Sequence, residues 1–235
     1  MKNVRHRFVT FFLVVAMNAL IIGFTVPATA AGTSAQQGLV DAARVTFNDF
    51  MRAESMSWVR DHLHEVKALL IIPSLLRGGF IIGGSGGRGV LVVKDSATGQ
   101  WSQPAFYSIG SFLFGLLIGG EAAVVLMLVR TQVAVDKLLA YSIKFGCDLT
   151  ITVGPIGGGA KSTIMADIYS FALSKGLYVG VSMEGAVVTT RDDWNTAYYG
   201  RAVTPADIFI LHSVSNPGSA ELRETVAQAA VVKQK

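Results

Sequence analysis

The sequence is poor in the residues that usually mark a covalent or metal site. Cysteine occurs once in 235 residues, as Cys147, and histidine occurs four times. A single cysteine excludes a disulfide framework, and we expect Cys147 to be a buried, unreactive thiol. His62 and His64 are two residues apart, so on a helix they point about 200° apart and cannot bind one metal ion together. His212 stands alone, and the sequence predicts no metal site.

Motifs for nucleotides and nucleophiles are also lacking. The segment 154–163, GPIGGGAKST, resembles a phosphate-binding loop, but Ala160 stands where that loop needs a glycine before the lysine. The glycines of 84–89 lack the spacing of the dinucleotide fingerprint, and no strand–helix unit follows them. No serine lies in a nucleophile elbow. The sequence therefore predicts no cofactor and no nucleotide as a ligand.

Charged residues make up only 15% of the chain, and the first thirty residues carry much of the positive excess. Lys2, Arg5 and Arg7 precede an apolar run, which ends before the small-residue site Ala28–Ala30. This pattern predicts a signal peptide over residues 1–30, with an uncleaved membrane anchor as the alternative. No cysteine follows the apolar run, which excludes a lipid-modified lipoprotein. We expect an exported protein, periplasmic or extracellular, with a peripheral membrane association open to it.

Cleavage would leave residues 31–235 as a single domain of nearly neutral charge. Removing the three cations lowers Lys+Arg from 20 to 17, against 16 acidic residues. A net charge of about +1 gives no general attraction to nucleic acid. Any anionic partner must therefore be bound by a local patch.

The stretch 69–95 organises the rest of the chain. Two apolar runs, Leu69–Ile72 and Val90–Val93, flank seven glycines between Gly78 and Gly89. Each glycine inside a helix would cost about 1 kcal/mol relative to alanine. Short β-branched runs bounded by turn residues are typical of buried strands, so we expect strands joined through a kinked, glycine-rich segment.

A second apolar stretch, 112–129, invites assignment as a membrane span. Glycines interrupt it, and Glu121 near its centre would cost about 2.5–3.5 kcal/mol on insertion. Two buried strands that turn near Gly119–Glu121 fit this pattern better.

Periodicity and turn residues predict the remaining elements. Helices are expected over 33–52, 55–67, 131–142, 192–199 (capped by Thr190), 204–209 (capped by Thr204, with Pro205 at its first position) and 220–232. The first of these carries an apolar stripe of Leu39, Ala43, Phe47 and Phe50. Strands are expected over 101–109, 144–153, 164–174 and 177–189, the last two joined by a hairpin at residues 174–176. The predicted fold class is α+β, with an antiparallel glycine-rich sheet or partly closed barrel and with N-terminal and C-terminal helices.

Two carboxylates lie in apolar, strand-like runs beside glycines, Glu121 and Glu184. We expect both to be buried, which requires a partner or a role. The structural alternative is that backbone N–H groups or a buried cation pair with each carboxylate. The functional alternative is that the carboxylates bind a ligand or act as acid–base groups.

From about residue 66 to residue 210 the chain resembles the SYLF domain family. The matching residues occur in one order: Ile72-Pro73, Arg77–Phe80, Gly83–Gly89, Gly99–Pro104, Gly119–Glu121, Gly154-Pro155 with Gly157, Tyr169-Ser170, Ser174–Leu177, Ser182–Gly185 and Asn195–Gly200. The resemblance implies a compact α+β domain that is not an enzyme. Eukaryotic members bind phosphoinositide membranes, partly through a basic N-terminal segment, and fungal members also bind actin filaments. The domain also occurs alone in exported bacterial proteins, and the resemblance implies that this chain is such a stand-alone member. Here acidic residues nearly balance the basic ones before residue 67, which weakens that attraction.

Three functional hypotheses follow from these observations. The first is a non-catalytic envelope protein that binds phospholipid through an apolar surface rimmed by Arg77, Arg88 and Lys161, which sit in or beside glycine-rich loops. The second is a scaffold that binds another envelope protein or a second copy of itself. The third is a hydrolase that uses Glu121 or Glu184.

Overall fold

The computed structural model describes residues 30–79, 82–114, 119–155 and 166–231. The chain divides into two units, residues 1–31 and 32–235, and all elements below belong to the second unit except the first two residues of α2. The predicted signal peptide, Lys161 and most of the segment 154–163 lie outside the described residues, so predictions about them stay predictions.

Helices precede and follow a central group of strands. The N-terminal helical elements are α2 (Ala30–Arg52), η1 (Glu54–Met56), α3 (Ser57–His62) and η2 (Leu63–Glu65). The strands are β1 (Ala68–Gly79), β2 (Ile82–Val93), β3 (Ala105–Phe114), β4 (Gly119–Val129), β5 (Ser142–Lys144), β6 (Ile151–Val153), β7 (Ile168–Ser174), β8 (Leu177–Val179) and β9 (Val187–Thr190). The other helical elements are α4 (Gln132–Leu138), α5 (Asp192–Tyr199), α6 (Pro205–Phe209), η3 (Pro217–Ser219) and α7 (Ala220–Ala230).

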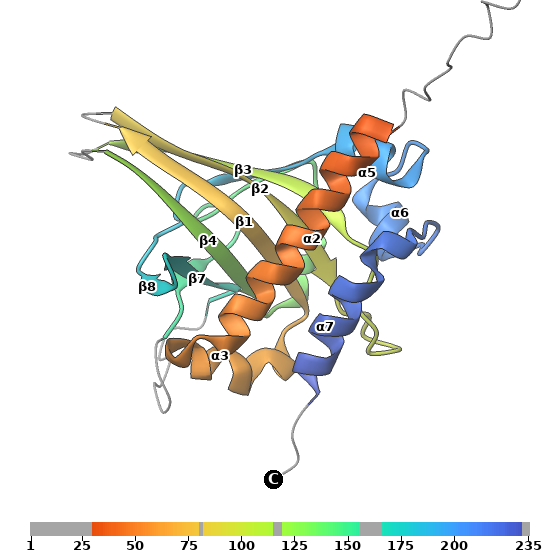
Figure 1. Ribbon diagram of the computed structural model, residues 1–235, viewed down its shortest axis with the longest axis horizontal. Coiled ribbons are helices and arrows are strands. Elements are labelled where there is room, and N and C mark those ends of the chain that lie inside the picture. Colours follow the sequence, from red (N-terminus) through yellow and green to blue (C-terminus); the bar gives the residue numbers. More distant parts are fainter. Residues whose placement is uncertain (1–29, 80–81, 115–118, 156–165, 232–235) are drawn as a thin grey trace, which may run out of the picture. The chain divides into compact units, whose positions relative to one another are not determined.

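The strands that the structure describes form one sheet, in the order β5-β9-β3-β2-β1-β4-β7-β6, with β8 paired to β7. The sheet is curled like a half-barrel, and α2 and α7 lie across it (Figure 1). All its pairings are antiparallel except that of β6 with β7. The predicted fold class, α+β with a glycine-rich antiparallel sheet, is confirmed.

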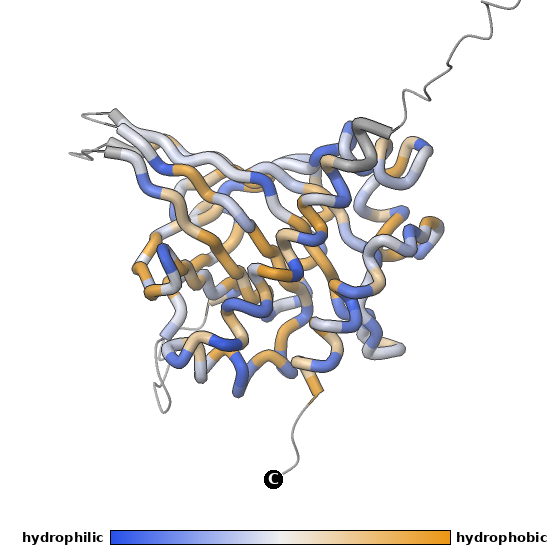
Figure 2. Tube along the Cα trace, in the orientation of Figure 1, coloured by the Kyte–Doolittle hydropathy of each residue, from blue (hydrophilic) through white to orange (hydrophobic). Residues whose placement is uncertain are grey.

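Both faces of the central strands are buried, which explains their uninterrupted apolar runs. Leu69 and Ile71 pack with the buried residues of α2 and α3, whereas Leu70 and Ile72 pack with those of α4. We call these two sides of the sheet the α2 face and the α4 face. Hydrophobic residues are concentrated where both faces are covered (Figure 2). The predicted burial of Leu69–Ile72 and Val90–Val93 is confirmed.

A bulge at Pro73 makes two of the glycines of β2 necessary. The pairing of β1 with both of its neighbours shifts register around this proline, which cannot donate a ladder hydrogen bond. A Cβ atom on Gly87 would lie 2.6 Å from the carbonyl oxygen of Ser74, and one on Gly89 would lie 2.8 Å from that of Ile71. Glycine is therefore required where β2 passes the bulge.

The helix predictions are confirmed in position and corrected in one detail. Ala43, Phe47 and Phe50 form the buried stripe of α2, as their spacing indicated. The helix α5 has the predicted bounds, but the predicted cap at Thr190 is wrong, because Arg191 occupies the N-cap and no side chain bonds there. The predicted cap at Thr204 is confirmed as a capping box with Asp207.

The predicted strand 177–189 divides into two strands on different parts of the sheet. The hairpin prediction at residues 174–176 is confirmed: Lys175 and Gly176 have positive φ values of 50° and 77°, and β8 pairs with β7. After β8 the chain crosses the α4 face, where Val181 and Met183 enter the core, and then pairs as β9 with β3 and β5. Pairing with strands that are distant in the sequence decides this path from β8 to β9, and such pairing cannot be predicted from sequence periodicity.

The apolar stretch 112–129 contains the end of β3 and the whole of β4, as predicted. The connection lies at residues 115–118, outside the described part, and Gly119–Glu121 begin β4 instead of forming the turn. Among the described residues, none of the helices combines the length and apolar character needed to cross a bilayer.

Asp167 links α4, β6 and β7 through hydrogen bonds. Its carboxylate accepts from the hydroxyl of Thr131 at 2.7 Å and from the backbone and side chain of Thr150 at 3.0 and 2.7 Å. Partial burial alone would raise the pKa of Asp167, but these bonds outweigh it and hold the pKa below 3.8.

We expect Asp167→Asn to lower the free energy of unfolding by about 1–2 kcal/mol at pH 7, because charged hydrogen bonds are lost. A carboxylate with a lowered pKa stabilises the fold above its unfolded pKa, and this contribution disappears as the pH falls through the folded value. The difference between parent and variant should therefore shrink between pH 5 and pH 2. Urea unfolding at both pH values measures it, with Asp61→Asn at an exposed carboxylate as the control. An equal difference at both pH values would contradict this account.

Candidate functional site

Beyond Leu75 the four central strands continue past both cores. In Figure 1 the ends of β1–β4 run to the upper left, away from α3 and α7. We call this part the glycine-rich end: residues 76–79 of β1, 82–86 of β2, 110–114 of β3 and 119–122 of β4. It presents two faces of different character.

The α2 face of the glycine-rich end carries no charged residue among its described side chains. Strand pairing aligns Ala122, Leu76, Gly86 and Gly110 in one row, and Gly120, Gly78, Gly84 and Phe112 in the next row on this face. Among the residues whose side chains the structure describes, Leu76 and Phe112 are the large ones on this face, and they are exposed by 61% and 89%. An aromatic side chain this exposed on an uncharged face is typical of an interaction surface.

The α4 face of the glycine-rich end carries a polar row instead. Strand pairing aligns Glu121, Arg77, Ser85 and Ser111 across β4, β1, β2 and β3. The two serine hydroxyls lie 2.7 Å apart and form a hydrogen bond. Arg77 and Glu121 are cross-strand neighbours, so their opposite charges attract each other weakly. This arrangement reduces the charge that Arg77 can offer to another anion.

Arg88 lies on the opposite face from Arg77, since Ser74 pairs with Arg88 whereas Arg77 pairs with Ser85 three positions away. Its guanidinium carbon is 5.0 Å from the centroid of the Trp194 ring of α5. Arg191 contacts the same ring at 5.2 Å. Arg191 also binds Asp193 through two hydrogen bonds of 2.9 and 2.6 Å, which lower the pKa of Asp193. Among the described residues Arg88 has no such carboxylate partner.

The structure thus separates two of the three predicted head-group residues. Arg77 and Arg88 lie on opposite faces of one sheet, and Lys161 lies outside the described residues. Sequence reasoning placed them together because all three are close to glycines. Alternation along the strands, combined with the register shift at Pro73, decides their faces. Sequence reasoning also missed Phe112 and Trp194. The only signal for them was an aromatic residue at a strand end or at a helix start.

The predicted burial of Glu121, Glu184 and Cys147 is wrong, since all three are exposed. Glu121 stands on the part of β4 that runs past the core. Glu184 lies in a turn on which Gly185 has a φ of 79°, and Cys147 lies in the turn after β5. Glu121 precedes the buried part of β4, whereas Glu184 and Cys147 follow the buried residues Met183 and Phe145 and are exposed because the chain turns there. No role for the two carboxylates is tested by this placement.

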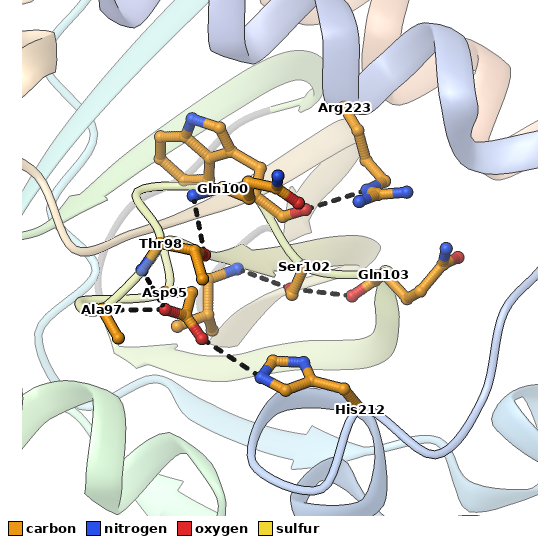
Figure 3. Close-up of polar contacts among 10 residues, drawn as sticks. Asp95, Ala97, Thr98, Gln100, Ser102, Gln103, His212 and Arg223 are labelled. Atoms are coloured by element: carbon orange, nitrogen blue, oxygen red, sulfur yellow. Dashed lines mark hydrogen bonds and ion pairs between the residues drawn. The ribbon is translucent and has the colours of Figure 1, made fainter.

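Polar residues of the segment 95–103 form hydrogen bonds with one another and with His212 and Arg223 (Figure 3). The Asp95 carboxylate accepts hydrogen bonds from the backbone N–H groups of Thr98 and Ala97, which lower its pKa, and lies 3.2 Å from Nε2 of His212. The hydroxyl of Ser102 accepts from the N–H of Val93 and donates to the carbonyl of Gln103. Arg223 of α7 donates to the carbonyl of Trp101.

The segment 195–200 contributes similar contacts. Asn195 is fully buried, and its Oδ1 accepts a hydrogen bond of 2.9 Å from the backbone N–H of Phe106. Tyr199 donates to the carbonyl of Pro104. The residues Gly99–Pro104 and Asn195–Gly200, on which the family resemblance rests, therefore join the strands to α5 and α7. Among the described residues no group of three His, Cys, Asp or Glu side chains could hold a metal ion.

Comparison with known proteins supports the same family. A family model described as Ysc84, Las17-binding protein actin regulator, matches residues 110–229, just over half of the chain. The chain belongs to the SYLF (Ysc84) family. The matched residues include Phe112, Glu121 and Trp194, and Arg77 and Arg88 precede them.

Several SYLF relatives are longer than this chain. An SH3 domain-containing protein of Schizosaccharomyces pombe is 33% identical over 159 residues, which are 65% of this chain and 36% of the relative. LAS seventeen-binding protein 3 of Saccharomyces cerevisiae is 32% identical over 149 residues, 60% of this chain and 32% of the relative. Human SH3 domain-containing YSC84-like protein 1 is 28% identical over 157 residues, 65% and 45% respectively. The chain thus matches less than half the length of each, and none of the three names is that of an enzyme.

Proposed function

We propose that this protein binds the surface of phospholipid membranes without catalysing a reaction, and that it docks through the α2 face of the glycine-rich end. The observation that carries the proposal is Phe112, which is 89% exposed on a face whose other described side-chain positions are Leu76, Ala122 and glycines. Moving a phenylalanine side chain from water into an apolar environment gains about 1.5–3 kcal/mol. Its described neighbours on this face include Gly84 and Gly110, which have no side chain to hold Phe112 away from a bilayer.

Charge adds to this apolar contact. A basic residue near an anionic membrane surface contributes about 1 kcal/mol. Arg88 lies on the same face as Phe112 and lacks a carboxylate partner among the described residues. Arg77 is the weaker candidate, because Glu121 lies beside it on the other face. Lys161 remains a candidate from the sequence alone.

In our proposal the protein works in the bacterial envelope, because the sequence of residues 1–30 resembles an export signal. Lys2, Arg5 and Arg7 before an apolar run, followed by Ala28–Ala30, support export. Phospholipid of the envelope is then the available membrane surface, and the protein would associate with it peripherally.

Vesicle flotation tests the proposal. The protein without residues 1–30 is mixed with vesicles of phosphatidylglycerol and phosphatidylethanolamine, or of phosphatidylcholine alone, at 50 mM and 500 mM salt. We expect it to float with the anionic vesicles, and less so at high salt, because salt screens the arginine contribution but not the apolar one. Absence of binding to anionic vesicles at low salt would refute the proposal.

A protein partner is the second candidate function. The family model bears the description of an actin regulator, and one relative is named for binding LAS seventeen. Ile210 and Leu211, directly after α6, are exposed by 59% and 65% and offer an apolar contact apart from the glycine-rich end. Sedimentation with purified actin filaments and light scattering test this alternative. Co-sedimentation, or a stable oligomer unchanged by lipid, would favour it over membrane binding.

A further inference from the structure

A groove with a volume of about 830 Å³ runs between α2 and the α2 face of the sheet, and Trp194 of α5 forms one wall. We call it the α2 groove. Ala35, Gly38 and Leu39 line it from the helix, and Leu76 and Gly86 line it from the strands. The volume is within the range of pockets that hold small ligands. Its walls are apolar or glycine along most of their length.

Two glycines keep the α2 groove open although the fold does not need them. A Cβ atom on Gly38 would have no neighbour within 4 Å, and one on Gly86 would meet nothing closer than 3.9 Å. By contrast, the adjacent Gly87 has no room for a side chain. Glycine in the interior of a helix costs about 1 kcal/mol relative to alanine, so Gly38 reduces the stability of α2 without a packing reason. What these positions preserve is space in the groove.

The groove carries charge at one place. Of the described residues that line it, Arg88 is the charged one. Its guanidinium is held over the Trp194 ring, and no described carboxylate pairs with it, whereas the nearby Arg191 is paired with Asp193. An apolar channel with one uncompensated guanidinium complements a hydrocarbon chain that ends in an oxyanion, because arginine binds phosphate oxygens through two parallel hydrogen bonds.

We propose that the α2 groove binds one acyl chain of an anionic phospholipid, with the phosphate at Arg88 and the hydrocarbon along Leu39, Leu76 and the two glycines. The proposal rests on the proposed function in one respect, that a membrane supplies the lipid. It assigns a different binding mode: Leu76, Gly86 and Arg88 belong to both surfaces, but docking through Phe112 requires only a bilayer surface, whereas the groove takes up one lipid molecule. The groove accommodates a single molecule.

The probe is myristoyl lysophosphatidylglycerol below its micellar concentration, and monomyristoylglycerol is the uncharged control. Calorimetric titration of the protein without residues 1–30 measures both affinities. Filling the groove by Gly38→Leu should weaken lysophospholipid binding at least tenfold while raising the melting temperature, because leucine favours the helix and its Cβ meets no neighbour. Val45→Leu, at an exposed position of α2 outside the groove, is the matched control and should bind like the parent.

Arg88→Gln should weaken the lysophospholipid about tenfold and leave the affinity for monomyristoylglycerol nearly unchanged. The proposal is overturned if the parent does not bind the lysophospholipid, if both lipids bind equally well, or if Gly38→Leu binds like the parent. It is also overturned if Gly38→Leu changes the oligomeric state in light scattering instead of the lipid affinity. In that case the groove is an interface between copies.

Vesicle flotation separates this proposal from the proposed function. Gly38→Leu should still float with anionic vesicles, since the glycine-rich end is unchanged. If the parent binds the lysophospholipid but fails to float, the membrane-docking function is refuted and the groove site stands. If it floats but binds no lysophospholipid, the groove proposal is refuted and the docking function stands.

Discussion

Replacing Phe112 by serine is expected to raise the dissociation constant for anionic vesicles about tenfold to a hundredfold. The side chain is almost fully exposed, so its loss removes about 1.5–3 kcal/mol of transfer into the bilayer and almost no internal packing. Binding at several lipid-to-protein ratios, measured by flotation, gives the change. Circular dichroism and the melting temperature should match those of the parent.

The control for Phe112 is Leu211→Ser. Leu211, directly after α6, is exposed by 65% and lies outside the four strands of the glycine-rich end. We expect this variant to bind vesicles like the parent. Equal weakening by both substitutions would mean that any exposed apolar residue contributes, and unchanged binding by Phe112→Ser would place the membrane contact elsewhere. Either result would contradict the docking surface proposed here.

Replacing Gly87 by alanine is expected to lower the free energy of unfolding by about 1–3 kcal/mol. The new Cβ would lie 2.6 Å from the carbonyl oxygen of Ser74 and 3.1 Å from Cγ2 of the buried Ile72. The first neighbour is backbone, so it can give way only if the bulge at Pro73 moves. Urea and thermal unfolding measure the loss, which corresponds to several degrees in melting temperature for a unit of this size.

The neighbouring Gly86 provides the matched control, because a Cβ there meets nothing closer than 3.9 Å. Gly86→Ala should change the free energy of unfolding by less than about 0.5 kcal/mol. Equal losses at both positions would show that backbone freedom, and not contact with the bulge, is the reason for glycine in this segment. A stable Gly87→Ala variant would remove the structural basis for the bulge argument.

Local sequence signals were sufficient wherever a single element decides the outcome. The spacing of Ala43, Phe47 and Phe50 identified the buried stripe of α2, and Thr204 followed by Pro205 identified the start of α6. The runs Leu69–Ile72 and Val90–Val93 identified the centre of the sheet, and the ordered motifs identified the family. The residues that signal each helix or strand lie close together in the sequence, so backbone geometry alone relates them.

The candidate site could not be predicted in the same way. Arg77 and Arg88 both flank glycines in the sequence, yet the register shift at Pro73 and the alternation of strand side chains put them on opposite faces. Glu121 is in an apolar run but stands where β4 has already left the core. Phe112 and Trp194 were missed, because the exposure of one and the stacking of the other depend on strands and helices far away in the sequence.

The sequence by itself determined the α+β class, the apolar strands and their glycine-rich interruption, and membership of the SYLF family. The tertiary structure alone decided which side chains share a face, how far the cores cover β1–β4, and where a groove remains beside α2. The physical reason is that hydrophobic periodicity records whether a residue faces a core. It does not record which core the residue faces, or where a paired strand extends beyond the elements that cover it.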